Sequence, residues 1–177
     1  MVLLLFALTN IVYAIMMIIT IPKIMAFSNG MKLLDMMPTG YESGYIISLF
    51  DTLGESGRHA YLYYQLPIDM IYPFLFGISY CFMIGYFLKK INKFDTVLFY
   101  LCFLPIIAGI ADYLENFGII SMLNNYPDLS LTSMNVTNYF SITKSMTTTV
   151  FFIALIIILL ILGYKTLKER KTSANTM

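Results

Sequence analysis

Four long runs of apolar residues, separated by shorter polar stretches, dominate the pattern of the sequence. A helix needs about 20 predominantly apolar residues to cross a hydrocarbon core of about 30 Å, and each run is long enough. The pattern therefore predicts an all-α protein, an integral membrane four-helix transmembrane bundle in a single domain over residues 1–177. The predicted spans cover about residues 2–21, 67–88, 96–118 and 142–164.

The first run begins directly at the N-terminus, which raises the alternative of a cleaved signal peptide. No positively charged segment precedes its apolar residues, and no small-residue cleavage site follows them. We therefore expect this segment to be a helix that stays in the protein.

The connection over residues 22–60 carries a helical pattern of its own. Apolar residues recur there at positions i, i+3, i+4 and i+7 with polar residues between them, which predicts a partly helical loop with an amphipathic helix over residues 43–53. We expect Ser43 to cap its start and Gly54 to end it. The helix either acts as a lid or fills the top of the bundle. Its apolar positions are Ile46, Leu49, Phe50 and Leu53.

Composition limits the class of protein. Hydrophobic residues make up 59% of the chain, charged residues 12%, and the mean hydropathy is +0.77. Soluble domains are about 45–50% apolar and about 25% charged, so the values exclude a soluble enzyme and a disordered tail. A net charge of +1 provides no basic field for nucleic acid. The expected partner is the lipid bilayer.

The basic residues predict how the chain is oriented. Lys89, Lys90 and Lys93 occupy the short turn between the second and third spans, and four more basic residues follow the fourth span. Cytoplasmic loops carry an excess of Lys and Arg. We therefore expect a multi-pass protein of the cell membrane with both termini in the cytoplasm, and the connections over residues 22–60 and 123–140 outside.

The remaining charges fall at one predicted depth. Counting about 20 residues outward from each cytoplasmic boundary reaches an ionisable residue on every span. Arg58 and His59 lie just before the second span and are expected to reach the same level. Below this level the spans carry almost no ionisable group. The residues reached by the count are Lys23, Asp69, Glu115 with Asp112 one turn deeper, and Lys144.

Helical spacing predicts which of these residues face each other. Residues three or four positions apart share a helix face. Asp112, Glu115 and Asn116 share one face in this way. A charge within the membrane is costly unless it is paired, so we expect Asp112 to point inward toward Lys144 or Arg58. On the second span the shared positions are Gln65, Asp69 and Tyr72, and we expect a kink between Pro67 and Pro73.

These residues predict a polar, charge-lined pocket at the outer membrane interface that binds or modifies an amphipathic, lipid-like ligand. The candidates for acid–base chemistry are His59, Asp69, Asp112 and Glu115. The candidates for ligand binding are Arg58, Gln65, Tyr72, Asn116 and Lys144, of which the two basic residues suit a phosphate or carboxylate.

Two alternatives remain beside the pocket. The charged layer can instead belong to a structural or accessory membrane subunit, in which it only holds the helices together. A small transporter or channel subunit is a third reading, although the chain has no inverted repeat. No cofactor and no metal site is predicted, because the two cysteines and the single histidine form no ligand signature.

Small residues on the second span predict close helix packing. Gly77, Cys81 and Gly85 are four positions apart and form a ridge that another helix can approach closely. We expect this ridge to pack inside the bundle, with a homo-oligomer through the same residues as the alternative.

Overall fold

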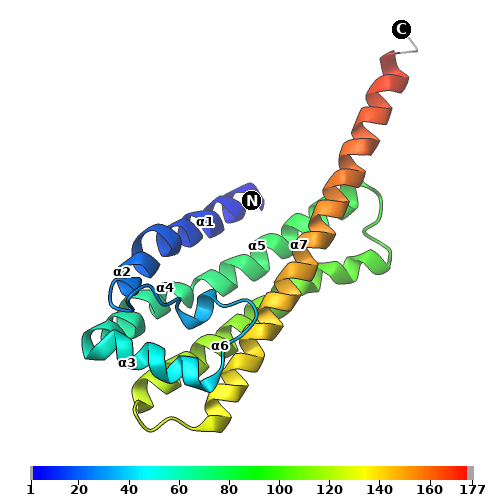
Figure 1. The fold of residues 1–177 in the computed structure, drawn as a ribbon. Helices are drawn as coiled ribbons and strands as arrows, with labels where there is room; N and C mark the ends of the chain where they lie inside the picture. The colour runs from blue at the N-terminus through cyan, green and yellow to red at the C-terminus, as the bar shows by residue number, and fades with distance from the viewer. Residues whose placement is uncertain (1, 175–177) are drawn as a thin grey trace.

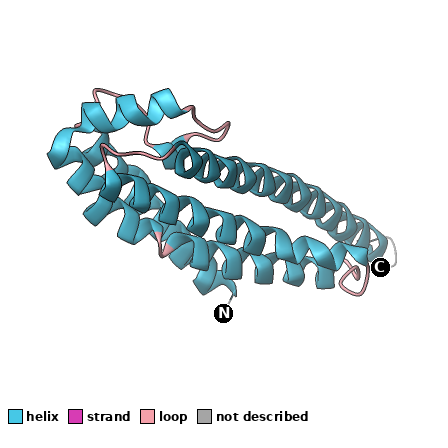
Figure 2. Ribbon diagram, turned by 90° about the horizontal axis from the view of Figure 1, so that it is seen from below, coloured by secondary structure: helices cyan, strands magenta, loops and turns pink. Residues whose placement is uncertain are grey.

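The computed structural model describes residues 2–174 and is all-helical over that range, as predicted. Its four long helical stretches, Val2–Met25, Ser43–Lys90, Val97–Asn125 and Leu131–Glu169, are each long and apolar enough to cross a membrane. The helices α5, α6 and α7 run side by side, α1 lies against α5, and α3 lies at the end of the bundle opposite the C-terminus (Figures 1 and 2).

The four stretches are built from shorter elements. The first consists of α1 (Val2–Ile15), η1 (Met16–Thr20) and α2 (Ile21–Met25). After the short turn η2 (Leu34–Met36), the second consists of α3 (Ser43–Ala60), η3 (Tyr61–Gln65), α4 (Leu66–Asp69) and α5 (Tyr72–Lys90). The third consists of η4 (Val97–Phe103) and α6 (Leu104–Asn125), and the fourth is α7 (Leu131–Ala174).

Prolines explain where the first two stretches change their winding. Proline has no N–H to donate to the carbonyl four residues earlier, so the preceding turn must adjust. Pro22 and Pro67 each stand near the start of a short α-helix, and a wide π-helical turn, η1 or η3, precedes it. The two wide turns meet, because the Thr20 hydroxyl donates a hydrogen bond to Gln65 Oε1.

The amphipathic helix forms where the sequence predicts it, with two differences. All four of its apolar positions are buried. Gly54 leaves the helical conformation with φ of 60°, as expected of a residue that ends a helix, but the chain resumes helical turns to Ala60. The prediction that Ser43 caps the helix is wrong: Glu42 is the N-cap residue, and its extended backbone precedes Ser43 without a capping side-chain bond.

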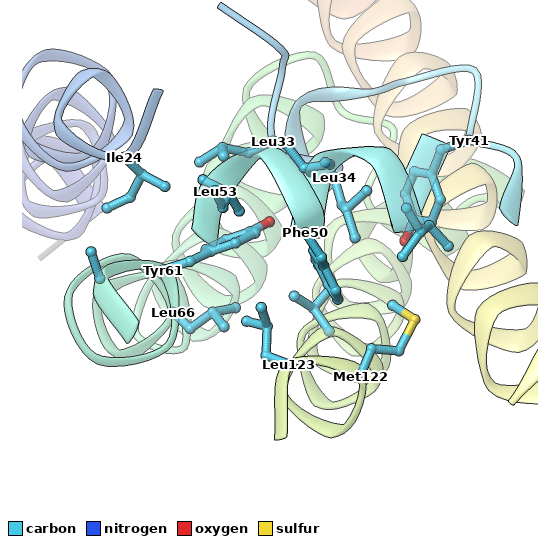
Figure 3. Packing of buried hydrophobic residues seen from close by; sticks show 14 of the residues in the cluster. Ile24, Leu33, Leu34, Tyr41, Phe50, Leu53, Tyr61, Leu66, Met122 and Leu123 are labelled. Atoms are coloured by element: carbon cyan, nitrogen blue, oxygen red, sulfur yellow. The ribbon is translucent and has the colours of Figure 1, made fainter. Parts of the chain in front are cut away.

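Two hydrophobic cores divide the described chain. The first, which we call the cap core, joins α3 to residues of the 26–42 connection, η3 and α6 (Figure 3). Its members include Leu34, Phe50, Tyr61, Ile119 and Met122. Since the buried side of α3 contributes to this core, α3 fills the end of the bundle.

The second core, which we call the span core, lies farther along α5, α6 and α7. Phe76 and Tyr80 of α5 meet Phe151 of α7 there, with ring centroids 6.0 and 5.5 Å apart. Ile84, Leu88, Cys102 and Leu155 are also buried in it.

The small residues of α5 allow close packing within the chain. Gly77 faces the backbone of Pro105 and Ile106 on α6, and Gly85 faces Phe94 and Cys102. α6 also approaches α5 closely at Gly109, where an added Cβ would lie 2.8 Å from the Pro73 carbonyl oxygen. The ridge therefore packs internally as expected, and the homo-oligomer through Gly77, Cys81 and Gly85 stays a prediction.

Candidate functional site

A layer of polar side chains separates the cap core from the span core. On α6, for example, Ala108 belongs to the span core and Ile119 to the cap core, with the polar residues between them. We call this group the polar layer; its members are Asp69, Asp112, Glu115, Asn116 and Lys144. All except Lys144 are buried.

The common level of this layer agrees with the spacing along the chain. At the opposite end, Lys165 Nζ donates a hydrogen bond to the Lys90 carbonyl oxygen at 3.1 Å, so these residues of α7 and α5 lie at one level. Lys144 precedes Lys165, and Asp69 precedes Lys90, by the same 21 residues. At about 1.5 Å per residue, both helices therefore reach the polar layer roughly 30 Å away.

Lys144 joins α7 to α6 through two carboxylates. Its Nζ atom lies 3.1 Å from Asp112 Oδ1 and also contacts Glu115 Oε2. The Glu115 side chain is fully buried, and that of Lys144 is only 16% exposed. Of the two partners predicted for Asp112, Lys144 is the one observed.

Asp69 lies at the break between α4 and α5. The helix is interrupted at Met70 and Ile71, within the interval where a kink is predicted. Pro73, four residues after Asp69, has no N–H for the Asp69 carbonyl. Asn116 Nδ2 of α6 donates to that carbonyl instead, at 3.3 Å. The amide thus replaces the missing helical bond and ties α6 to the kink.

The backbone carbonyl of Asp69 has a hydrogen-bond donor, whereas one oxygen of its carboxylate has none. The residue is only 3% exposed, and its Oδ2 atom has no hydrogen-bond partner within residues 2–174. Buried polar atoms are nearly always hydrogen-bonded, and leaving one unpaired costs about 1–3 kcal/mol or more for a charged group. The exception calls for an explanation.

A cavity of about 380 Å³ lies in front of Asp69. Asp69, Asp112, Lys144 and Tyr72 are among the residues that line it, and Asp35 lines it from the 26–42 connection. Its other walls come from α1 and η1, from α5 and α6, and from the hydroxyl-rich part of α7. They include Tyr13, Met16, Met17, Ile21, Phe76, Ala108, Ser145, Thr148 and Thr149.

Residues that line the cavity are exposed both near α1 and on α7. Met17 of η1 is 41% exposed, and Thr149 of α7 is exposed too. α1 packs against α5, whereas α7 packs mainly against α6, and residues of both helices line the cavity.

The 26–42 connection covers the polar layer with groups that the sequence pattern does not predict. Tyr61 Oη donates to Asp35 Oδ1 at 2.7 Å, and Gln65 Nε2 donates to Asp35 Oδ2 at 3.1 Å. Gln65, predicted to bind ligand, is therefore engaged with Asp35 and Thr20. No periodic pattern marks Asp35, because η2, in which it lies, is only three residues long.

Tyr41 approaches the layer from the same connection. Its backbone N–H donates to Asn138 Oδ1 of α7 at 2.8 Å, and its hydroxyl lies 3.4 Å from Glu115 Oε1. Burial, together with the negative charge of Glu115, raises the pKa of the Tyr41 phenol well above its ordinary value. Tyr41 therefore keeps its proton and presents a donor to Glu115.

Arg58 and His59 take positions away from the cavity. Arg58 Nη1 donates to the Phe50 carbonyl oxygen at 2.7 Å, and its guanidinium lies 4.2 Å from the centroid of the Tyr126 ring. His59 is exposed and its ring lies 4.5 Å from that of Tyr63. Neither is among the described residues that line the cavity. Lys23 likewise lies over the Tyr64 ring, at 4.3 Å.

The geometry divides the candidate residues into groups. The cavity brings together Asp69, Asp112, Tyr72 and Lys144, with Glu115 and Asn116 directly behind them. Within residues 2–174, no three His, Cys, Asp or Glu side chains converge to hold a metal ion. The site can bind a ligand by charge, hydrogen bonding and apolar contact.

Comparison with known proteins adds no family to this description. No protein-family model matches the chain, no curated protein matches it, and no solved structure matches its fold.

Proposed function

We propose that this chain is a multi-pass membrane protein that binds an amphipathic, lipid-like ligand in the cavity beside Asp69. The polar end of the ligand lies at Asp69 and Asp112, and its apolar part lies toward α1 and α7. One observation carries the proposal: the unpartnered, buried Oδ2 of Asp69 belongs to a residue that lines a cavity large enough for a ligand.

The walls of the cavity support a ligand with two unlike ends. Carboxylates and hydroxyls line part of the cavity, while Met16, Ile21 and Phe76 are apolar. Ligand pockets are typically apolar with a few placed polar groups. A wholly polar molecule would leave the apolar wall unused, and a wholly apolar one would leave Asp69 unpartnered.

The first prediction concerns Asp69. Replacing it with Asn keeps the shape of the side chain but removes the charge, and we expect the protein to lose an amphiphile that the unmodified chain retains during purification in mild detergent. Native mass spectrometry measures the bound mass. Asp112 is less suitable for this test, because its replacement also breaks an ion pair with Lys144.

Asp95→Asn is the matched control for that experiment. It makes the same change of charge at an exposed position in the turn between α5 and α6. We expect it to retain the bound mass of the unmodified chain. Purification of the unmodified chain free of any amphiphile, or equal loss in both variants, would contradict the proposed function.

A second candidate function rests on the ion pairs themselves. Lys144 lies between Asp112 and Glu115 in a largely buried contact, as expected of a structural or accessory subunit whose charges hold its helices together. In that case Asp112→Asn, which breaks an ion pair, lowers the yield of folded protein, Asp69→Asn leaves the yield nearly unchanged, and no ligand is found. Measuring yield and bound mass on the same preparation separates the two functions.

We also propose that both termini lie in the cytoplasm and the cap core lies outside. The basic turn between α5 and α6 and the basic segment of α7 lie at one end of the bundle, which agrees with the excess of Lys and Arg on cytoplasmic sides. The cavity then lies near the outer interface of the membrane.

The orientation makes a prediction for cysteine labelling in intact cells. In a background with Cys81 and Cys102 replaced by Ala, we expect a membrane-impermeant maleimide to label Glu55→Cys from outside. Asp95→Cys should react only after the membrane is permeabilised. Both positions are exposed, so accessibility to reagent does not limit the comparison. The reverse pattern would place the cap core in the cytoplasm.

A further inference from the structure

We infer that the polar end of the ligand is a primary ammonium group, so that the cavity takes a cationic amphiphile such as a long-chain amine. This inference rests on the proposed function and identifies the class of ligand for the same cavity.

The charges around the cavity favour a cation. Asp35, Asp69 and Asp112 line it, and Lys144 is the one basic residue among the described lining residues. Lys144 is already shared between Asp112 and Glu115, so its charge is compensated from within the protein. The lining groups therefore carry a formal excess of negative charge that a cationic ligand would balance.

Hydrogen bonding favours a group that donates. A carboxylate accepts hydrogen bonds only, whereas a primary ammonium offers three N–H donors. Asp69 Oδ2 is a buried acceptor without a donor in the described part of the chain. An ammonium in the cavity beside the Asp69 carboxylate would supply N–H donors and the opposite charge, and charge-assisted bonds of this kind are the stronger ones.

An anionic head group fits the same surroundings poorly. A phosphate or carboxylate would lie beside Asp69 and Asp112, which are of like charge, and Lys144 would have to leave its two partners to bind it. The other basic residue considered for this role, Arg58, is engaged with the Phe50 carbonyl and the Tyr126 ring. The phosphate expected from the sequence is therefore not the ligand chemistry that the cavity favours.

Aromatic rings add a second attraction for a cation. The Tyr13 and Tyr72 rings have centroids 5.7 Å apart, and the Tyr72 and Phe76 centroids are 5.8 Å apart. All three residues line the cavity with Asp69. The faces of aromatic rings attract cations within about 6 Å. This attraction is open to primary and quaternary ammonium groups alike, whereas the hydrogen bond to Asp69 requires an N–H.

A series of probes with one chain and different head groups tests the inference. Tetradecylamine, tetradecyltrimethylammonium, tetradecanol and tetradecyl sulfate are each titrated into the full chain in nonionic detergent, and binding is measured by native mass spectrometry. We expect the amine to bind at least about tenfold more tightly than the alcohol and the sulfate. The trimethylammonium compound should fall between the amine and the alcohol.

Variants connect this preference to Asp69. In Asp69→Asn, the amine should bind no more tightly than the trimethylammonium compound, whereas Asp95→Asn should keep the full preference for the amine over that compound. Tighter binding of the sulfate, equal binding of the amine and the trimethylammonium compound, or a preference that survives Asp69→Asn would each overturn the ammonium assignment and leave the proposed function standing. Failure of every probe to bind, together with an amphiphile-free unmodified chain, would overturn both.

Discussion

Replacing Lys144 with Met is expected to destabilise the protein by about 3–5 kcal/mol. The ammonium contacts Asp112 and the fully buried Glu115, and no second basic residue lines the cavity among those described. Removing it leaves two carboxylates near each other without a compensating charge. The change in the free energy of unfolding is measured by denaturant titration in mixed micelles.

Two further variants make this prediction specific to the ion pairs. Lys165→Met removes the same kind of side chain from the same helix, where Lys165 is bonded to the Lys90 carbonyl in an exposed setting. Exposed substitutions usually change stability by no more than about 0.5 kcal/mol. The triple change Lys144→Met, Asp112→Asn and Glu115→Gln should recover much of the loss, because it also removes the unpaired charges. If Lys144→Met lowers the free energy of unfolding no more than Lys165→Met does, the ion pairs of Lys144 contribute little to stability.

Replacing Phe50 with Ala is the second change for which we expect a large effect, about 3–5 kcal/mol. Phe50 is fully buried in the cap core, and its ring lies edge-on to that of Tyr126, at 5.9 Å between centroids. Truncation removes this contact and leaves a void between α3 and α6. The Phe50 carbonyl also accepts a hydrogen bond from Arg58. The expected loss is for the side chain alone, with the backbone and this hydrogen bond left in place.

The neighbouring Ile47 provides the control, because it lies on the same helix and is 43% exposed. Ile47→Ala should cost well under 1 kcal/mol. Thermal unfolding gives the two losses, and hydrogen exchange of the α3 amides shows where the structure loosens. If Ile47→Ala lowers the free energy of unfolding as much as Phe50→Ala does, the buried face of α3 has been assigned to the wrong side.

Hydropathy and spacing predict the spans and the level of the polar layer because both depend on distance along a helix. About 1.5 Å per residue converts the 21 positions between Lys144 and Lys165 into a depth, and the same count applies to Asp69 and Lys90. The shared face of Asp112 and Glu115 follows from helical periodicity in the same way. Lys144 could therefore be identified as a partner before any coordinates.

The placement of Arg58 and His59 could not be predicted by the same argument. A count along the chain gives height but not direction around the bundle, and the break at Gly54 and the wide turn of η3 both change that direction. Asp35 and Tyr41 were missed for a related reason. They come from the 26–42 connection, whose helix η2 is only three residues long, so no period relates one residue to the next, and long-range packing decides their position.

The bond from Asn116 to the Asp69 carbonyl has a mechanical consequence. Sliding α6 along α5 by one turn, about 5.4 Å, would strip that carbonyl of its donor inside the membrane, and the contact between Gly109 and Pro73 would be lost as well. The hydrogen bond and the close contact therefore both favour one register of α6 against α5. α1 is held mainly by α5, and α7 mainly by α6. If the proposed ligand enters between α1 and α7, a cross-link between these two helices should slow its release.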